Sequence, residues 1–129
     1  MTIVGTGIDL VENDRMREVL ARWGAKFKDR VFRDNEQAYC ESTADPARHY
    51  AGRFAVKEAV AKAFGTGLGP HLGLLDIEVV RHAESGAPSV RLSGKAGGLA
   101  DRRRVSAVRI SLSHTRSLAV AHAILVGEE

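Results

Sequence analysis

The stretch RFAVKEAVAKAFGTGLG, residues 53–69, decides the fold of this 129-residue chain. At about 100° per residue, Val56 and Val60 lie on one side of a helix, and Glu58 and Lys62 lie almost opposite them. The helix cannot extend through GTGLG, because three glycines in five residues disfavour it. The stretch therefore predicts a helix with a carboxylate and an ammonium on one exposed stripe. A glycine loop follows, whose backbone a ligand can approach closely.

Taken alone, Glu58 and Lys62 are also typical of an ordinary surface ion pair. Their i,i+4 spacing stabilises a helix by only about 0.2–0.5 kcal/mol. The rest of the chain has to decide between a solvated helix face and a site.

Length and composition are those of one globular domain spanning residues 1–129. The content is 44% hydrophobic and 27% charged, which is ordinary for such a domain. The single cysteine excludes an intrachain disulfide framework and fits a reducing compartment. Neither a signal peptide nor an apolar run of about 20 residues is recognisable, so we expect a cytoplasmic protein that does not bind membranes.

The net charge of +3 favours an acidic partner, which can be a nucleic acid, a phosphorylated small molecule or an acidic protein. An aromatic content of 5% is low for a protein that stacks single-stranded bases. Charge alone does not choose among these partners.

Hydrophobic periodicity and turn residues predict an α+β fold, with a long central helix packed on an antiparallel β-sheet. Asp9 is expected near the end of the first strand, and His114 at an accessible turn. The expected helices are 13–23, 34–41, 47–64 and 94–104, and the expected strands are 2–10, 74–81, 89–92, 108–114 and 118–126.

The helix predicted over 13–23 is amphipathic. Met16 and Trp23 belong to its apolar stripe, and Arg15 and Arg22 to its basic outer face. Such a run is usually solvated, but it also suits an acidic partner helix. The arginines at 102–104 are expected to be solvated.

Asp9, Glu58, Lys62 and the glycine loop together suggest a chemistry. Mg²⁺ typically takes one or two protein carboxylates, several waters and oxygens of a phosphorylated substrate. Two carboxylates and a lysine can therefore hold a metal-bound pyrophosphate, whose chemistry depends mostly on positioning and charge neutralisation. The loop has no Gly-Lys-Ser/Thr, so a P-loop is excluded.

Three motifs carry a resemblance to a known family: GIDLV at 7–11, the stretch 53–67, and ISLSHT at 110–115. With these motifs the chain resembles bacterial holo-acyl-carrier-protein synthases, the small class of 4′-phosphopantetheinyl transferases. The resemblance covers essentially the whole chain, and the middle motif is the specific one. Residues 41–50 and 94–105 match only loosely, and Thr115 stands where some relatives carry an acidic residue.

The resemblance implies transfer of phosphopantetheine from coenzyme A to a serine of acyl carrier protein, in support of fatty acid biosynthesis. It implies that Asp9 and Glu58 bind Mg²⁺ and that Lys62 lies near the coenzyme A phosphates, and these three form the implied catalytic set. The remaining residues implied at the coenzyme A site are Arg53, Lys57, Gly65, Thr66 and His114. The general base can be Glu58 or a metal-bound water.

The resemblance also implies partners. The acceptor is an acidic carrier, free or as a domain of a fatty acid synthase, and Arg15 and Arg22 are expected to dock it. A homotrimer is implied, with sites at the subunit boundaries and the turn around Pro88 over a neighbour's coenzyme A. The alternative function is a non-catalytic basic module that binds nucleotide or RNA; the leading hypothesis involves no nucleic acid.

Overall fold

The computed structural model describes residues 1–70 and 72–128. The elements follow in the order β1 (Thr2–Glu12), α1 (Asn13–Trp23), α2 (Ala25–Val31), α3 (Asp34–Glu41), α4 (Pro46–Phe64), the 3₁₀ helix η1 (Leu74–Asp76), β2 (Ile77–Arg81), β3 (Pro88–Leu92), α5 (Gly94–Arg102), β4 (Val105–His114) and β5 (Leu118–Gly127).

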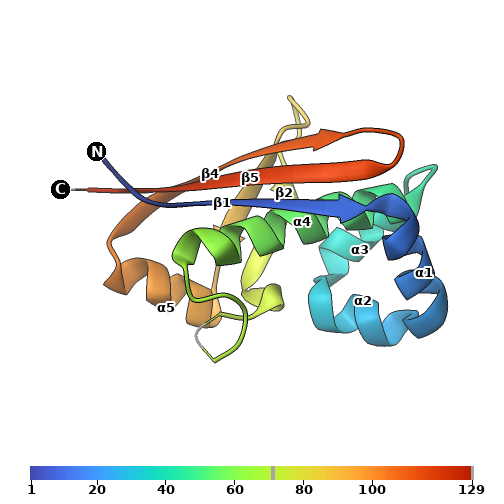
Figure 1. The fold of residues 1–129 in the computed structure, drawn as a ribbon, viewed down its shortest axis with the longest axis horizontal. Helices are drawn as coiled ribbons and strands as arrows, with labels where there is room; N and C mark the ends of the chain where they lie inside the picture. The colour runs from blue at the N-terminus through green and yellow to red at the C-terminus, as the bar shows by residue number, and fades with distance from the viewer. Residues whose placement is uncertain (71, 129) are drawn as a thin grey trace.

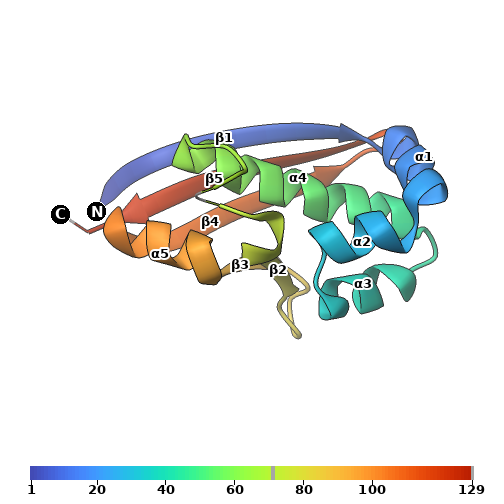
Figure 2. The same cartoon turned by 90° about the horizontal axis from the view of Figure 1, so that it is seen from below.

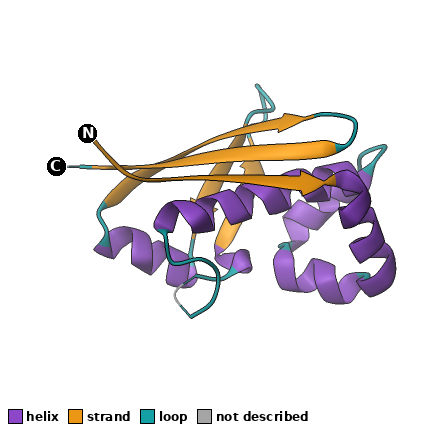
Figure 3. Ribbon diagram, in the orientation of Figure 1, coloured by secondary structure: helices purple, strands orange, loops and turns teal. Residues whose placement is uncertain are grey.

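The long helix α4 packs along one face of an antiparallel sheet with the strand order β1-β5-β4 (Figure 1). The other helices lie on the same side of this sheet as α4 (Figure 3). The strands β2 and β3 form a separate antiparallel hairpin. Seen from below, α1, α2 and α3 gather at the N-terminal half of α4, and α5 lies near its C-terminal end (Figure 2). The predicted α+β architecture is confirmed.

Glycines let β1 lie directly against α4. A Cβ atom on Gly5 would come within 1.9 Å of the Ala63 carbonyl oxygen, and one on Gly7 within 2.0 Å of the Ala59 carbonyl oxygen. Real side chains do not fit at such distances, so both positions require glycine. This close crossing brings Asp9 to the face of α4 that carries Glu58 and Lys62.

The opposite face of the sheet carries exposed apolar side chains. Ile8 and Leu10 on β1 are 61% and 58% exposed. Ile8 pairs with His122 and Leu10 with Val120 on β5. Neighbouring exposed apolar groups of this kind are typical of an interaction surface.

Three local predictions were wrong, and tertiary packing accounts for each. No helix was expected after Gly24, yet α2 forms there, since Val31 and Phe27 pack into a hydrophobic cluster with Phe32. The strand expected from residue 74 starts as η1 and becomes extended only at Ile77. Trp23 was expected in the core but is 52% exposed.

Among the described residues, no helix has both the length and the apolar character that crossing a bilayer needs.

Candidate active site

Asp9 and Lys62 are in direct contact where β1 crosses α4. Nζ of Lys62 donates to Oδ1 of Asp9 over 2.9 Å and to the carbonyl oxygen of Ile8 over 3.1 Å. The Asp9 side chain is 16% exposed, whereas the Lys62 side chain is 52% exposed. The ammonium group is therefore held by the protein on one side and open to a ligand on the other.

Glu58 lies one turn before Lys62 on α4 and is within the field of Asp9. Burial raises the pKa of Glu58 above its usual value, the Asp9 carboxylate raises it further, and Lys62 opposes the shift. Two carboxylates that disfavour each other's ionisation become more stable when positive charge is added between them. The structure thus brings Asp9, Glu58 and Lys62 together.

Asp9 and Glu58 suit a divalent ion that completes its coordination elsewhere. Within residues 1–70 and 72–128, no group of three or more His, Cys, Asp or Glu side chains is placed to hold a metal. Structural zinc needs such a group, whereas Mg²⁺ commonly keeps waters and binds substrate phosphates besides one or two carboxylates. The pair therefore fits Mg²⁺ presented with a phosphorylated substrate.

The glycine loop leaves α4 beside this pair. Gly65 ends the helix in the left-handed region with φ of 78°, and Gly67 has φ of 65°. Gly65 and Thr66 are exposed, and the space where a Cβ of Gly65 or Gly67 would stand is open. A ligand held by Lys62 can approach this backbone.

A second cluster gathers around Arg53 and His114. The Arg53 guanidinium lies over the Tyr39 ring at 4.2 Å, and the rings of His114 and His49 are 6.0 Å apart. His114 packs on Gly52 so closely that a Cβ there would come within 2.7 Å of its Cε1. His114 ends β4 beside the turn, as expected, but its side chain is half-buried against α4, so the predicted accessibility is wrong.

This second cluster contains buried nitrogen atoms that make no hydrogen bond. Nε of Arg53 and Nδ1 of His114 are buried and have no partner in the part of the chain that the structure describes. Burial lowers the pKa of His114, and the positive charges of Arg48, His49 and Arg53 lower it further. Buried polar atoms are normally satisfied, so this cation-rich cluster suits an anion such as a phosphate group.

The two clusters lie on different faces of α4. Arg53 is about 140° and His49 about 180° around the helix from Glu58, at about 100° per residue. Asp9 reaches one face from β1, whereas Tyr39 and Arg81 pack near Arg53 on the other. The structure does not bring Arg53 and His114 to Glu58 within one chain.

We expect stability to fall as the pH drops through about 6.5, the pKa of an unperturbed histidine. The pKa values of His49 and His114 are lowered in the folded state by burial and neighbouring arginines. The unfolded chain therefore binds protons first, and acidification favours unfolding. Melting temperatures measured by calorimetry between about pH 7.5 and pH 5.5 should fall less steeply in a His49→Gln/His114→Gln variant. The control is His82→Gln, an exposed histidine in the turn after β2. An unchanged slope in the double variant would contradict the prediction.

Lys57 is not at a ligand-accessible surface, which corrects its predicted place in the coenzyme A site. Its side chain is fully buried, and Nζ donates to Oε1 of Glu36 over 2.8 Å and to the carbonyl oxygen of Leu74 over 3.0 Å. Glu36 also accepts from the backbone N–H groups of Arg33 and Val79. Through these hydrogen bonds, Lys57 connects α4 to α3 and η1 in the protein interior, and Glu36 extends the connection to β2. In the sequence, Lys57 is marked only by its position one residue before Glu58, which does not reveal that its side chain is buried.

Arg15 and Arg22 are exposed on α1, as a docking role requires. The Arg22 guanidinium lies 5.2 Å from the centre of the Trp23 ring. Beside them, α2 adds a hollow of about 370 Å³ lined by Trp23, Lys26, Phe27 and Arg30. Sequence reasoning missed this hollow because it did not predict α2. The exposed Trp23 was the signal that was misread as core.

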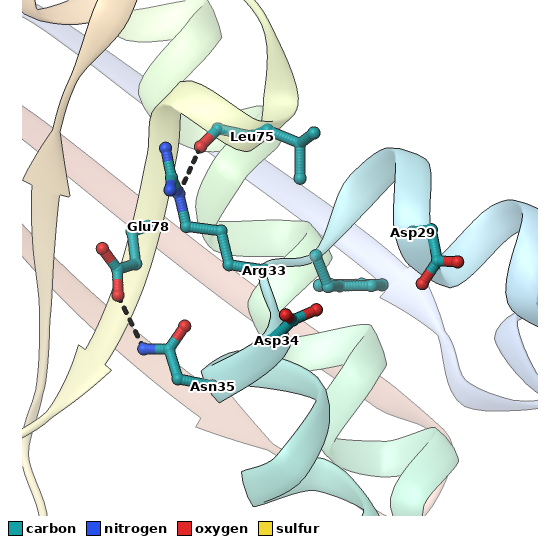
Figure 4. Close-up of a pocket in the computed structure, with 7 residues that line it drawn as sticks. Asp29, Arg33, Asp34, Asn35, Leu75 and Glu78 are labelled. Atoms are coloured by element: carbon teal, nitrogen blue, oxygen red, sulfur yellow. Dashed lines mark hydrogen bonds between the residues drawn. The ribbon is translucent and has the colours of Figure 1, made fainter.

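A larger hollow, of about 530 Å³, lies between the start of α3 and the segment η1–β2 (Figure 4). Its lining includes three carboxylates and consists of Asp29, Phe32, Arg33, Asp34, Asn35, Leu75 and Glu78. Arg33 is already engaged, since its Nε donates to the Leu75 carbonyl oxygen over 2.8 Å. The acidic lining does not suit a polyphosphate.

Comparison with known proteins gives a consistent match over most of the chain. Residues 5–123 match the model of the 4′-phosphopantetheinyl transferase superfamily. The holo-[acyl-carrier-protein] synthase of Syntrophus aciditrophicus is 46% identical over 123 residues, which are 95% of this chain and 95% of that protein.

Solved structures agree with this match. The crystal structure of holo-[acyl-carrier-protein] synthase from Neisseria meningitidis aligns with a TM-score of 0.89 at 26% identity, covering 97% of this chain and 99% of that one. The Bacillus anthracis holo-(acyl-carrier-protein) synthase, in complex with CoA (3′,5′-ADP), aligns with a TM-score of 0.82 at 33% identity, covering 99% and 100%. Both the sequence and the fold are therefore similar to those of transferases.

Proposed function

The chain belongs to the holo-[acyl-carrier-protein] synthase family of the 4′-phosphopantetheinyl transferase superfamily, and from that membership we propose that it transfers 4′-phosphopantetheine from coenzyme A to a serine hydroxyl of an apo acyl carrier protein. One observation carries the proposal: β1 and α4 bring Asp9, Glu58 and Lys62 together beside an open glycine loop. The reaction would release adenosine 3′,5′-bisphosphate and support fatty acid biosynthesis.

In this proposal Asp9 and Glu58 hold Mg²⁺, which would neutralise charge on the pyrophosphate of coenzyme A. The serine oxygen forms a bond to the β-phosphorus, and the bond from that phosphorus to the bridging oxygen breaks. Lys62 stabilises the negative charge left on adenosine 3′,5′-bisphosphate. Glu58 would accept the serine proton as this bond forms. Thr66 and the neighbouring glycines let the loop backbone approach the nucleotide.

We propose that the complete site forms between copies in a homotrimer. The cluster of Arg53 and His114, with its two unpartnered buried atoms among the described residues, suits the 3′-phosphate of coenzyme A but faces away from Glu58 in one chain. A second copy is needed for one ligand to meet both clusters. The exposed Ile8 and Leu10 on the outer sheet face supply an apolar surface for such contacts.

Sedimentation equilibrium should therefore give a mass close to three chains at micromolar concentration. An Ile8→Asp variant should shift the mass toward one chain, because burying an unpaired carboxylate in an apolar interface is unfavourable. Transfer activity should fall with it. The control is Ser106→Asp, which adds the same charge at an exposed position on β4. A monomeric and fully active protein would contradict the trimer.

The basic face of α1 is the proposed docking surface for the carrier. Arg15 and Arg22 are exposed, and Trp23 with the adjoining hollow offers apolar area beside them. Acidic helices are attracted by such a face, and the effect falls mainly on encounter rate and salt dependence.

Reversing both charges in Arg15→Glu/Arg22→Glu should raise the KM for the carrier by about tenfold or more, because attraction becomes repulsion. The KM for coenzyme A should stay within about twofold. Steady-state kinetics with each substrate varied in turn separates the two. The matched control is Arg102→Glu, an exposed arginine on α5. Equal effects on both KM values would remove the docking assignment.

Mass spectrometry of apo acyl carrier protein tests the proposal as a whole. After incubation with this protein, coenzyme A and Mg²⁺, the carrier should gain the mass of one phosphopantetheine, and a chelator should prevent it. Absence of the product from a folded protein would overturn the proposal. The comparisons favour this enzyme over the alternative of a non-catalytic basic module. We also propose a cytoplasmic location, which the single, free Cys40 supports.

A further inference from the structure

The run of arginines at 102–104 contains one residue with a specific contact. Nη1 of Arg103 donates to the carbonyl oxygen of Phe64, the last residue of α4, although the two are 39 positions apart in sequence. The guanidinium carbon also lies 5.8 Å from the centre of the Phe64 ring. Phe64 is 1% exposed, and Arg103 is partly buried, whereas Arg102 and Arg104 are exposed.

The contact of Arg103 lies at the C-terminal end of α4, directly before the glycine loop. The last carbonyl groups of a helix have no partner within the helix, and a cation there interacts favourably with the helix dipole. The next residue, Gly65, starts the glycine loop in the left-handed region. Glycines have the widest conformational freedom, so the direction of the loop depends on contacts that hold its ends.

The far side of the loop is held in a similar way. Gly69 N–H donates to the carbonyl oxygen of Leu72 over 2.9 Å, and Leu72 is fully buried. Two residues later, the carbonyl oxygen of Leu74 accepts from the buried Nζ of Lys57. Cations from α4 and from the end of α5 thus anchor the carbonyl groups on both sides of residues 65–69.

From these contacts we infer that Arg103 is a positioning residue for the transfer reaction. It acts through the Phe64 carbonyl, which fixes how residues 65–69 leave α4 and face coenzyme A. It does not touch the reacting atoms. The inference rests on the proposed function in one respect only, namely that this loop faces coenzyme A. The anchoring itself is independent of that function.

The test compares Arg103→Met with Arg103→Lys and with the exposed control Arg102→Met. In Arg103→Met the KM for coenzyme A should rise about tenfold, the factor that corresponds to losing a hydrogen bond from a charged donor. The value of kcat and the KM for the carrier should stay within about twofold. Arg103→Lys keeps a cation at the helix end and should recover part of the effect. Arg102→Met should match the unaltered protein.

Hydrogen exchange of the ligand-free protein supplies a readout besides activity. The amides of Gly65 and Gly69, both hydrogen-bonded here, should exchange about tenfold faster in Arg103→Met than in Arg102→Met. Unchanged exchange would overturn the inference, whatever the kinetics. Faster exchange with an unchanged KM for coenzyme A would also overturn it, as would equal changes in kcat and both KM values. If the unaltered protein transfers nothing, the proposed function fails, and exchange alone still decides the anchoring.

Discussion

Replacing Glu58 with Gln is expected to lower kcat/KM for phosphopantetheine transfer by at least about 10³-fold while the protein stays folded. The variant removes one of the two carboxylates proposed to hold Mg²⁺ and also the proposed proton acceptor, and losses of this size are usual when a group that stabilises transition-state charge is removed. Asp9→Asn should have an effect of similar size. Transfer measured with apo carrier protein, coenzyme A and saturating Mg²⁺ checks both.

The stability of Glu58→Gln separates a site from ordinary surface structure. Since burial and the Asp9 charge raise the pKa of Glu58 in the folded protein, its ionised form is disfavoured there, and a neutral Gln should not lower the melting temperature. Calorimetric titration of Mg²⁺ in the presence of coenzyme A should show weakened binding. The control is Asp29→Asn on α2, whose exposed carboxylate accepts from Gln37. Near-normal transfer by both site variants would end the metal-site assignment.

Replacing Lys57 with Met is expected to cost about 3–5 kcal/mol of unfolding free energy, the usual cost of leaving one member of a buried ion pair alone. Both side chains of the Lys57–Glu36 pair are fully buried, and Glu36 additionally holds backbone N–H groups of Arg33 and Val79. Without Lys57 the carboxylate must stay charged in the interior or take up a proton. Urea denaturation with a constant m-value gives the change.

A second ion pair, which is exposed, serves as a matched comparison for the buried Lys57–Glu36 pair. Arg17 and Asp45 lie at the same separation, 2.8 Å, but their side chains are 51% and 44% exposed. Arg17→Met should therefore lower the unfolding free energy much less than Lys57→Met does, because solvent screens an exposed ion pair. In Glu36→Gln/Lys57→Met no unpaired charge remains, so this double variant should be less destabilised than Lys57→Met. If Lys57→Met lowers the unfolding free energy no more than Arg17→Met does, burial of the ion pair does not decide how much stability is lost with its cation.

Local sequence patterns were sufficient to predict most helices and strands, but not those whose conformation depends on tertiary packing. Helix α1 and the strands β4 and β5 follow from periodicity, because each buries one face. Helix α2 did not, since its seven residues form a helix only through the contacts of Phe27 and Val31 with distant side chains. Trp23 fitted the apolar stripe of α1 by spacing, yet its side chain stays half-exposed because the described part of the chain does not cover that end of the stripe.

The sequence by itself determined the long helix, its glycine stop and the stripe that carries Glu58 and Lys62, because helix periodicity and glycine conformational freedom act over neighbouring residues. Only the tertiary structure decided the remaining arrangement. It brought Asp9 to Lys62 through the close crossing at Gly7, buried Lys57 against Glu36 and turned Arg53 away from Glu58. These three arrangements depend on which segments, distant in sequence, pack against each other. Whether a charged side chain is buried is likewise set by this packing and not by its spacing along the chain.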